Sequence, residues 1–120
     1  MNGLKGPNQV GKDIGFVTSL YPDMRSVAVS PDVYKEDAQQ ASYNGADDSC
    51  KALDKDLVVP DKNELISMYY NSKILGMPGS SYWSANMTNN NNEAWFLYFG
   101  AGNLYGGGLS TSLSVRCIKR

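Results

Sequence analysis

Apolar and polar residues alternate most regularly near the end of the chain, in LSTSLSVRCIKR at 109–120. A period of two is typical of a strand with one buried face, so we expect the last strand here. The alternation divides this strand into two faces. Its inward positions are Leu109, Thr111, Leu113, Val115 and Cys117, and its outward positions are Ser110, Ser112 and Ser114.

A helical pattern is clearest in PDKNELISMYY at 60–70. Leu65, Met68 and Tyr69 follow the i, i+3, i+4 spacing of one helix face. Asp61 is a good N-cap, and Glu64 stands three residues later, which completes a capping box. The segment therefore predicts a helix that begins just after Asp61.

In the rest of the chain the pattern of apolar and polar residues falls into shorter segments. Taken together, the expected strands and helices predict a single α+β domain over residues 1–120. The expected strands are 14–21, 26–30, 82–87 and 93–99. The expected helices are 33–43 and 46–53, with Asn44-Gly45 interrupting the pattern between them. The expected loops and turns are 1–13, 76–81 and the glycine-rich stretch 100–108.

The strand at 93–99 is aromatic on both faces, which raises the question of which face is buried. If Trp95, Leu97 and Phe99 face the core, then Phe96 and Tyr98 are exposed beside the glycine-rich loop. Grouped exposed aromatics are typical of binding surfaces. We expect Trp83, by contrast, to lie in the core, whereas Tyr82 fits either the core or a ligand site.

Composition and charge argue against several classes of function. The 11 basic and 12 acidic residues form no basic stripe, so we expect no nucleic-acid partner. The chain has no His, no GxSxG or Ser-x-x-Lys motif, and no phosphate-loop lysine at 100–108, so we predict neither an enzyme nor a cofactor. Abundant Gly, Tyr, Ser and Asn suit a recognition surface, although a secreted domain rich in loops has the same composition.

Two other motifs carry weaker predictions. Asp47, Asp48, Asp54 and Asp56 form an acidic group, but the ligand spacing of a calcium loop is missing, so we predict a solvated face and no metal site. Asn86-Met87-Thr88 matches a glycosylation sequon, a match that also arises often by chance.

Cys50 and Cys117 are too far apart for a CxxC motif. We expect them to form a disulfide, and hence an oxidising compartment, with two buried thiols as the alternative. No apolar run approaches the roughly 20 residues of a membrane span. Met1 is not followed by a signal peptide. We therefore expect a missing segment upstream of Met1, and any membrane attachment to lie in it.

Four features over residues 38–120 together resemble a known family: Cys50, LVVPDKNELISMYY, YWS, and EAW followed by VRCIKR. They are similar to the C-type-lectin-fold domain at the C-terminus of collagen-like bacterial adhesins. The chain departs from the family pattern at Val59-Pro60-Asp61, where Leu-Pro-Thr is usual, in lacking a preceding Gly-Trp, and at Ala85, where a second Ser follows YWS.

The resemblance implies a C-type lectin-like fold with two short helices and small antiparallel sheets. An irregular loop region would form the binding face, and Cys50 would pair with Cys117. Residues 1–37 would supply a lead-in and the first strands, and NGLKGPNQVGKD within them resembles the segment after the hydrophobic helix of prepilin-like proteins. That helix would be the missing upstream part.

Some members of this fold family are variable proteins of diversity-generating retroelements, in which template adenines are randomised. Randomised Asn codons never give Lys, Glu, Gln, Met or Trp, and residues 96–114 contain none of these five. In NNNNEAW, at 89–95, the asparagines would then belong to a ligand face, with Trp95 as a buried anchor. The alternative is an ordinary polar turn, which Asn also favours.

We therefore predict a non-enzymatic, surface-displayed binding domain of a bacterium or phage, with an unknown protein or glycan ligand and no metal. The alternatives are the exposed head of a pilin subunit, which would assemble into an oligomer, and a fixed glycan-binding adhesin. An enzyme of the formylglycine-generating group shares the fold, but its chemistry needs free thiols. The predicted ligand-binding residues are Asn86, Thr88, Asn90, Asn92, Phe96, Tyr98, Ala101, Asn103, Tyr105, Ser110 and Ser112.

Overall fold

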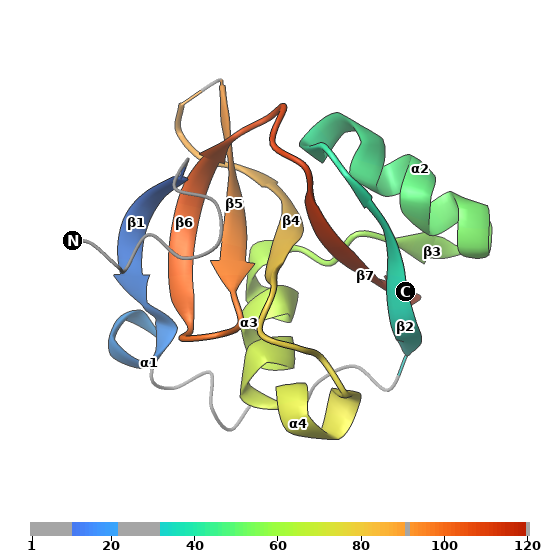
Figure 1. The fold of residues 1–120 in the computed structure, drawn as a ribbon, viewed down its shortest axis with the longest axis horizontal. Helices are drawn as coiled ribbons and strands as arrows, with labels where there is room; N and C mark the ends of the chain where they lie inside the picture. Colours follow the sequence, from blue (N-terminus) through green and yellow to red (C-terminus); the bar gives the residue numbers. More distant parts are fainter. Residues whose placement is uncertain (1–10, 22–31, 91, 120) are drawn as a thin grey trace.

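Eleven helices and strands follow one another along the described part of the chain, which a computed structural model gives as residues 11–21, 32–90 and 92–119 (Figure 1). Together they form a small α+β domain with a mixed sheet. The strands are β1 (Gly11–Phe16), β2 (Val33–Ala41), β3 (Leu57–Val58), β4 (Ser81–Met87), β5 (Glu93–Tyr98), β6 (Asn103–Gly108) and β7 (Leu113–Lys119). The helices are α1 (Val17–Leu20), α2 (Tyr43–Leu53), α3 (Lys62–Tyr70) and α4 (Ser72–Leu75).

The seven strands form one sheet in the order β1-β6-β5-β4-β7-β2, and β3 also pairs with β7. Every pairing is antiparallel except the contact of β4 with β7, which is one parallel bridge between Tyr82 and Ser114. The last strand, β7, thus has three neighbouring strands. All of residues 113–118 are buried as a result.

The sheet has a hydrophobic core on each face. On one face α3 packs against β4 and β5, and its Leu65 and Met68 join Leu97 in one cluster (Figure 1). On the other face α2 packs against β2, β3 and β7, and Trp83 and Phe96 belong to the second cluster. Both faces of the central strands are therefore covered, and several of the predicted binding residues are buried as a result.

The helix predicted at 60–70 is confirmed as α3, together with its capping box. The Asp61 carboxylate accepts a hydrogen bond from the Glu64 backbone N–H at 2.7 Å, and Glu64 Oε1 accepts one from the Asp61 N–H at 2.8 Å. Leu65 and Met68 are buried, as their spacing predicts. This element needs only local signals, because both cap partners lie within one turn.

Replacing the cap gives a prediction of modest size. Asp61→Ala should lower the free energy of unfolding by about 1 kcal/mol, because the N–H of Glu64 loses its acceptor. Urea unfolding followed by circular dichroism measures this. The exposed Asn63→Ala variant in the same helix is the control, and an equal loss in both variants would contradict the assigned cap.

Several other predictions are confirmed. The strands expected at 82–87 and 93–99 are β4 and β5, and the helix expected at 46–53 is α2. This helix begins earlier than expected, at Tyr43, so Asn44-Gly45 lies inside it and does not interrupt the pattern. The strand expected at 26–30 lies outside the described residues.

The helix predicted at 33–43 is wrong, because residues 33–41 form the strand β2. This strand pairs with β7, with Asp37 opposite Arg116 and Ala38 opposite Val115. Most of its residues are good helix formers, but helix propensity is a weak preference that tertiary strand pairing overrides. Ala38 is buried in the core, and Gln39 and Gln40 follow it within the same strand.

The glycine-rich loop predicted at 100–108 is also wrong beyond residue 102, because residues 103–108 form β6 between β1 and β5. Glycine in this strand permits close packing of a neighbouring side chain. A Cβ on Gly107 would lie 2.4 Å from the Phe96 ring, so only glycine lets that ring reach the strand. Two further boundaries differ: residues 17–20 of the predicted first strand are the helix α1, and the last strand begins at Leu113 after a turn.

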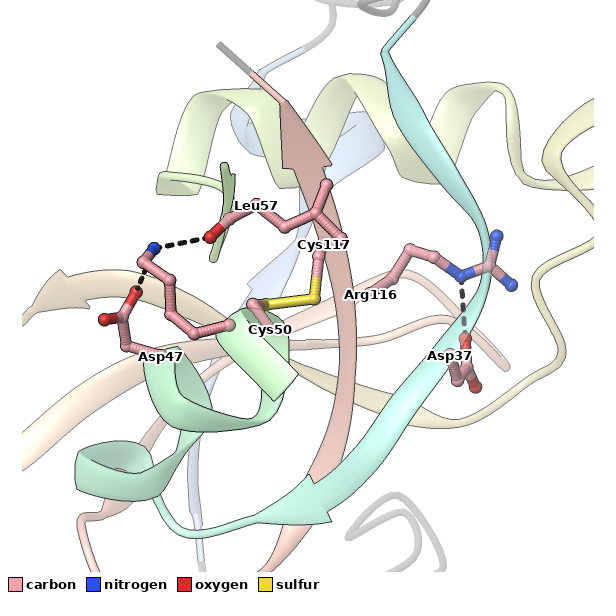
Figure 2. The surroundings of a disulfide bond; sticks show 7 residues. Asp37, Asp47, Cys50, Leu57, Arg116 and Cys117 are labelled. Carbon is pink, nitrogen blue, oxygen red and sulfur yellow. Dashed lines mark hydrogen bonds and ion pairs between the residues drawn. A yellow bond between two sulfur atoms is a disulfide. The ribbon is translucent and has the colours of Figure 1, made fainter. Parts of the chain in front are cut away.

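The predicted disulfide is present between Cys50 and Cys117, which lie 67 residues apart (Figure 2). It ties the last helical turn of α2 to β7, the strand with three neighbouring strands. Both cysteines are fully buried. Disulfides persist mainly in oxidising environments, so this bond is consistent with such a compartment.

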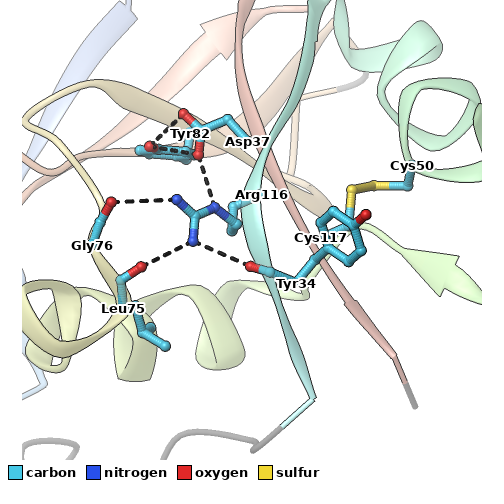
Figure 3. Close-up of polar contacts among 8 residues, drawn as sticks. All are labelled: Tyr34, Asp37, Cys50, Leu75, Gly76, Tyr82, Arg116 and Cys117. Atoms are coloured by element: carbon cyan, nitrogen blue, oxygen red, sulfur yellow. Dashed lines mark hydrogen bonds and ion pairs between the residues drawn. A yellow bond between two sulfur atoms is a disulfide. The ribbon is translucent and has the colours of Figure 1, made fainter. Parts of the chain in front are cut away.

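A polar network crosses the buried part of the sheet at Arg116 (Figure 3). The Arg116 guanidinium is 3% exposed and pairs with Asp37 at 2.8 Å. It also donates to the backbone carbonyls of Tyr34, Leu75 and Gly76. The Tyr82 hydroxyl donates to the same Asp37 carboxylate at 2.8 Å. The network therefore joins β7, β2, β4 and the end of α4.

Burial, followed by the hydrogen bond to Asp37, raises the pKa of Tyr82 well above its ordinary value. Above about pH 10 the unfolded chain releases this proton while the folded chain keeps it. Stability should therefore fall as pH rises beyond 10, with a contribution from Tyr82 of up to about 1.4 kcal/mol per pH unit. Tyr82→Phe should flatten the alkaline limb of stability against pH, measured by urea unfolding between pH 8 and 11. An unchanged slope would contradict this role.

Candidate functional site

The polar tract between β4 and β5 forms an ordered turn on the surface. The Asn90 backbone N–H donates to Thr88 Oγ1 at 3.0 Å, and the Asn92 N–H donates to Asn90 Oδ1 at 2.9 Å. The Thr88 N–H closes the turn on the Glu93 carbonyl at 3.1 Å. The predicted residues Thr88, Asn90 and Asn92 therefore meet here, and Asn90 and Asn92 are exposed.

A second polar turn, residues 109–112, connects β6 to β7 at the same end of the sheet (Figure 1). The two turns are neighbours because Glu93, the first residue of β5, pairs with Gly108, the last residue of β6. Ser110 and Ser112 are both exposed. We call the combined region the turn surface, and its predicted members are Asn86, Thr88, Asn90, Asn92, Ser110 and Ser112.

Asn86 connects the turn surface to the start of α3. Its side chain is exposed, and its Oδ1 accepts a hydrogen bond from the Lys62 backbone N–H at 2.6 Å. The Lys62 ammonium lies over the Trp95 ring, 5.0 Å from its centroid, and bonds to the Tyr21 hydroxyl at 2.9 Å. Trp95, predicted to be buried, is therefore only half-buried, with Lys62 over its ring.

The structure separates Ala101 from the turn surface. Ala101 is exposed, but it lies in the turn between β5 and β6, at the opposite end of these strands. Tyr98 ends β5 on the same side and is half-buried against the core. A Cβ added at Gly100 would lie 2.4 Å from the Tyr98 ring, so the ring lies directly on this glycine.

Three predicted binding residues cannot line any surface, because Phe96, Asn103 and Tyr105 are each at most 1% exposed. Phe96 stacks on Tyr105 with ring centroids 4.9 Å apart and meets Trp83 edge-on. The expected exposure of Phe96 was wrong because the strand-face argument assumed a single core. Trp83 is buried as predicted.

Burial also explains part of the composition that suggested diversification. Residues 102–107 and 113–114 are buried, and they make up much of the stretch 96–114. Lys, Glu and Gln are rarely found fully buried, so their absence from this stretch needs no randomised codons. Ser114, expected to face outward, is likewise buried where β7 meets β4.

A small hollow of about 200 Å³ opens beside the second turn, between β2, β4 and β7. We call it the serine hollow; its lining residues are Gln40, Gly79, Ser80, Ser81, Ser112, Leu113 and Ser114. Ser112 is its only predicted member. Sequence reasoning missed the rest, although the serine-rich stretches GSSYWS and STSLS were a visible signal.

Ser81 is the unusual member of the serine hollow. It is 4% exposed, and its Oγ is the one buried side-chain polar atom in the described ranges without a hydrogen-bond partner. Ser81 pairs with Tyr98 across β4 and β5. Buried polar groups are nearly always hydrogen-bonded, so this hydroxyl calls for an explanation.

A larger hollow of about 400 Å³ lies between α2, β3 and β4, and three of its polar side chains already have partners. The Tyr43 hydroxyl donates to the Ala85 carbonyl at 2.9 Å, and Ser84 Oγ donates to the Trp95 carbonyl at 2.7 Å. Asp47 pairs with Lys51. These contacts support a packing role for its lining.

Within residues 11–21, 32–90 and 92–119, no three His, Cys, Asp or Glu side chains come close enough to hold a metal ion. Of the acidic group, Asp54 Oδ1 accepts the Asp56 N–H at 2.8 Å. None of the described helices combines the length and the apolar character needed to cross a membrane. The sequence matches no protein-family model, and no curated protein matches it significantly.

Proposed function

We propose that this chain is a non-enzymatic ligand-binding domain that uses the turn surface to hold its ligand. The observation that carries the proposal is the meeting of two exposed polar turns at one end of a doubly covered sheet. Binding residues commonly lie on loops that a rigid scaffold positions. The disulfide and the two cores supply that scaffold here.

The chemistry of the turn surface suits recognition by hydrogen bonding. Asn side chains offer both donors and acceptors, and Ser hydroxyls do the same. The ligand would be a protein or a glycan, bound without a metal. Phe96 and Tyr105 are excluded as aromatic anchors by their burial, and Tyr98 lies at the opposite end of β5 from the turn surface.

A C-type lectin-like fold is part of the proposal. The mixed sheet, the two longer helices α2 and α3, and the disulfide between α2 and the last strand are consistent with the resemblance of residues 38–120 to that family. Display outside the cell is also proposed, and it is supported by the disulfide.

The test is a screen of the oxidised domain against arrays of glycans and of extracellular proteins. We expect saturable binding to at least one ligand class, with the ligand recovered chemically unchanged. Thermally unfolded protein is the control. Binding no stronger than that of the unfolded control would contradict a binding function, and a converted ligand would contradict a non-enzymatic one.

The head of a pilin-like subunit is the second candidate, and one feature favours it. Ile14, Phe16 and Leu20, on β1 and α1, are apolar yet 38–44% exposed. An assembly contact would cover them. Phe16→Ser should then abolish incorporation into fibres without changing ligand binding; normal incorporation would contradict this alternative.

Diversification of the turn surface is proposed only as a property of the same binding function. Sequencing around the gene would reveal a near-copy of the codons for 82–120 that differs mainly at adenines, beside a reverse transcriptase. Substitutions should then fall on exposed positions such as Asn90 and Ser110. Without such a copy, the surface is that of a fixed adhesin.

A further inference from the structure

The serine hollow has the properties of a small binding site, and it extends the proposed function by suggesting a ligand class. Among its described lining residues, the side-chain polar groups are hydroxyls from four serines and the amide of Gln40, and none of these residues is charged. A charged ligand would lose its hydration here without gaining a counter-charge. The chemistry therefore selects a neutral ligand.

The ligand must also both donate and accept hydrogen bonds. A serine hydroxyl carries one donor and two acceptor positions, and a Gln amide carries both kinds of group. A hydroxyl of a ligand offers the same combination. Among the described buried groups, the Ser81 hydroxyl is the one left for such a partner, since its Oγ makes no hydrogen bond to the described part of the chain.

Size and shape limit the ligand further. At about 200 Å³ the hollow is smaller than the roughly 300–1,000 Å³ of sites for drug-sized molecules. Leu113 adds an apolar side chain to the lining. Tyr98 lies close by, because it pairs with Ser81 and its ring rests on Gly100, which approaches the lining residue Gly79. A ring with hydroxyls on its edge and C–H groups on its face would use both kinds of contact.

We infer that the serine hollow binds one neutral, polyhydroxylated ring, such as a single pyranose unit, with the Ser81 hydroxyl as a buried hydrogen-bond partner. The hollow adjoins the turn surface through Ser112, which belongs to both. This inference rests on the proposed function and assigns the hollow as one subsite of a larger ligand. The remainder of that ligand would extend over Ser110 and the first turn.

The test is titration of the 15N-labelled domain with glucose, galactose, mannose, N-acetylglucosamine and myo-inositol, followed by NMR. We expect saturable shifts at the amides of Ser80, Ser81, Ser112 and Ser114 with at least one of these compounds. Ser81→Ala should weaken that binding at least tenfold and leave the thermal unfolding midpoint unchanged or higher, because it removes an unpartnered buried hydroxyl.

A matched pair of variants in one turn locates the ligand. Ser112→Leu should abolish the shifts by filling the hollow, while Ser110→Leu, outside the lining, should preserve them. No saturable shift with any compound, or equal binding by both variants, would overturn the inference. An ordered water at Ser81, with no sugar bound, would overturn it as well. Array binding by a domain that fails this titration would leave the proposed function standing.

Discussion

Removing the disulfide should lower the free energy of unfolding by roughly 4 kcal/mol, the expected effect for a crosslink that closes a loop of this length. Cys50 and Cys117 lie 67 residues apart and join α2 to the last strand, β7. Without the bond, the unfolded chain regains the freedom that the crosslink removes. The double variant Cys50→Ala/Cys117→Ala tests this by urea unfolding.

Wild-type protein unfolded in the presence of a reductant is the companion measurement, since it breaks the same crosslink and keeps both sulfur atoms. Both samples should lose similar stability, and the alanine variant should lose slightly more because it also removes buried volume. A loss below about 1 kcal/mol in both samples would contradict a stabilising role for the bond.

Replacing Arg116 by Met should cost about 2 kcal/mol or more, because the half-buried Asp37 carboxylate loses its counter-charge and three backbone carbonyls lose a charged donor. The substitution would strand the Asp37 carboxylate and remove a donor from the carbonyls of Tyr34, Leu75 and Gly76. Lys35→Met, at an exposed position of β2, is the matched control and should change stability by no more than about 0.5 kcal/mol.

A second variant separates the charge from the packing. Asp37→Leu/Arg116→Met replaces both partners by apolar groups, a change that is often nearly neutral at buried pairs. It should be more stable than Arg116→Met alone, as measured by the urea midpoint. If the double variant is the less stable of the two, the stranded carboxylate is not the source of the loss.

Elements whose signals are local could be predicted from the sequence. The cap of α3 needs only Asp61 and Glu64, and the strands β4 and β5 are rich in aromatic residues. Elements that depend on distant partners could not be predicted in this way. Residues 33–41 form a strand because they pair with β7, and residues 103–108 form a strand because they pair with β1 and β5.

The same distinction between local signals and distant partners applies to the residues of the candidate site. The Asn-rich turn was predicted to lie at the surface because polar residues and turn-forming Asn residues coincide there. Phe96 and Tyr105 were misassigned because alternation along one strand does not reveal a second core on its other face. The serine hollow was missed because it draws on three separate segments that only the fold brings together.

The most direct test of the proposed binding function compares two lysine substitutions on the turn surface with two elsewhere. Asn92→Lys and Ser110→Lys place a bulky charge on the turns, whereas Asn63→Lys and Ser19→Lys place the same charge on exposed positions of α3 and α1. All four variants would be measured for affinity to the ligand found by the array screen. We expect the first two to lose at least tenfold in affinity and the second two to bind like the wild type. Equal affinity of all four variants would show that the ligand binds elsewhere on the molecule.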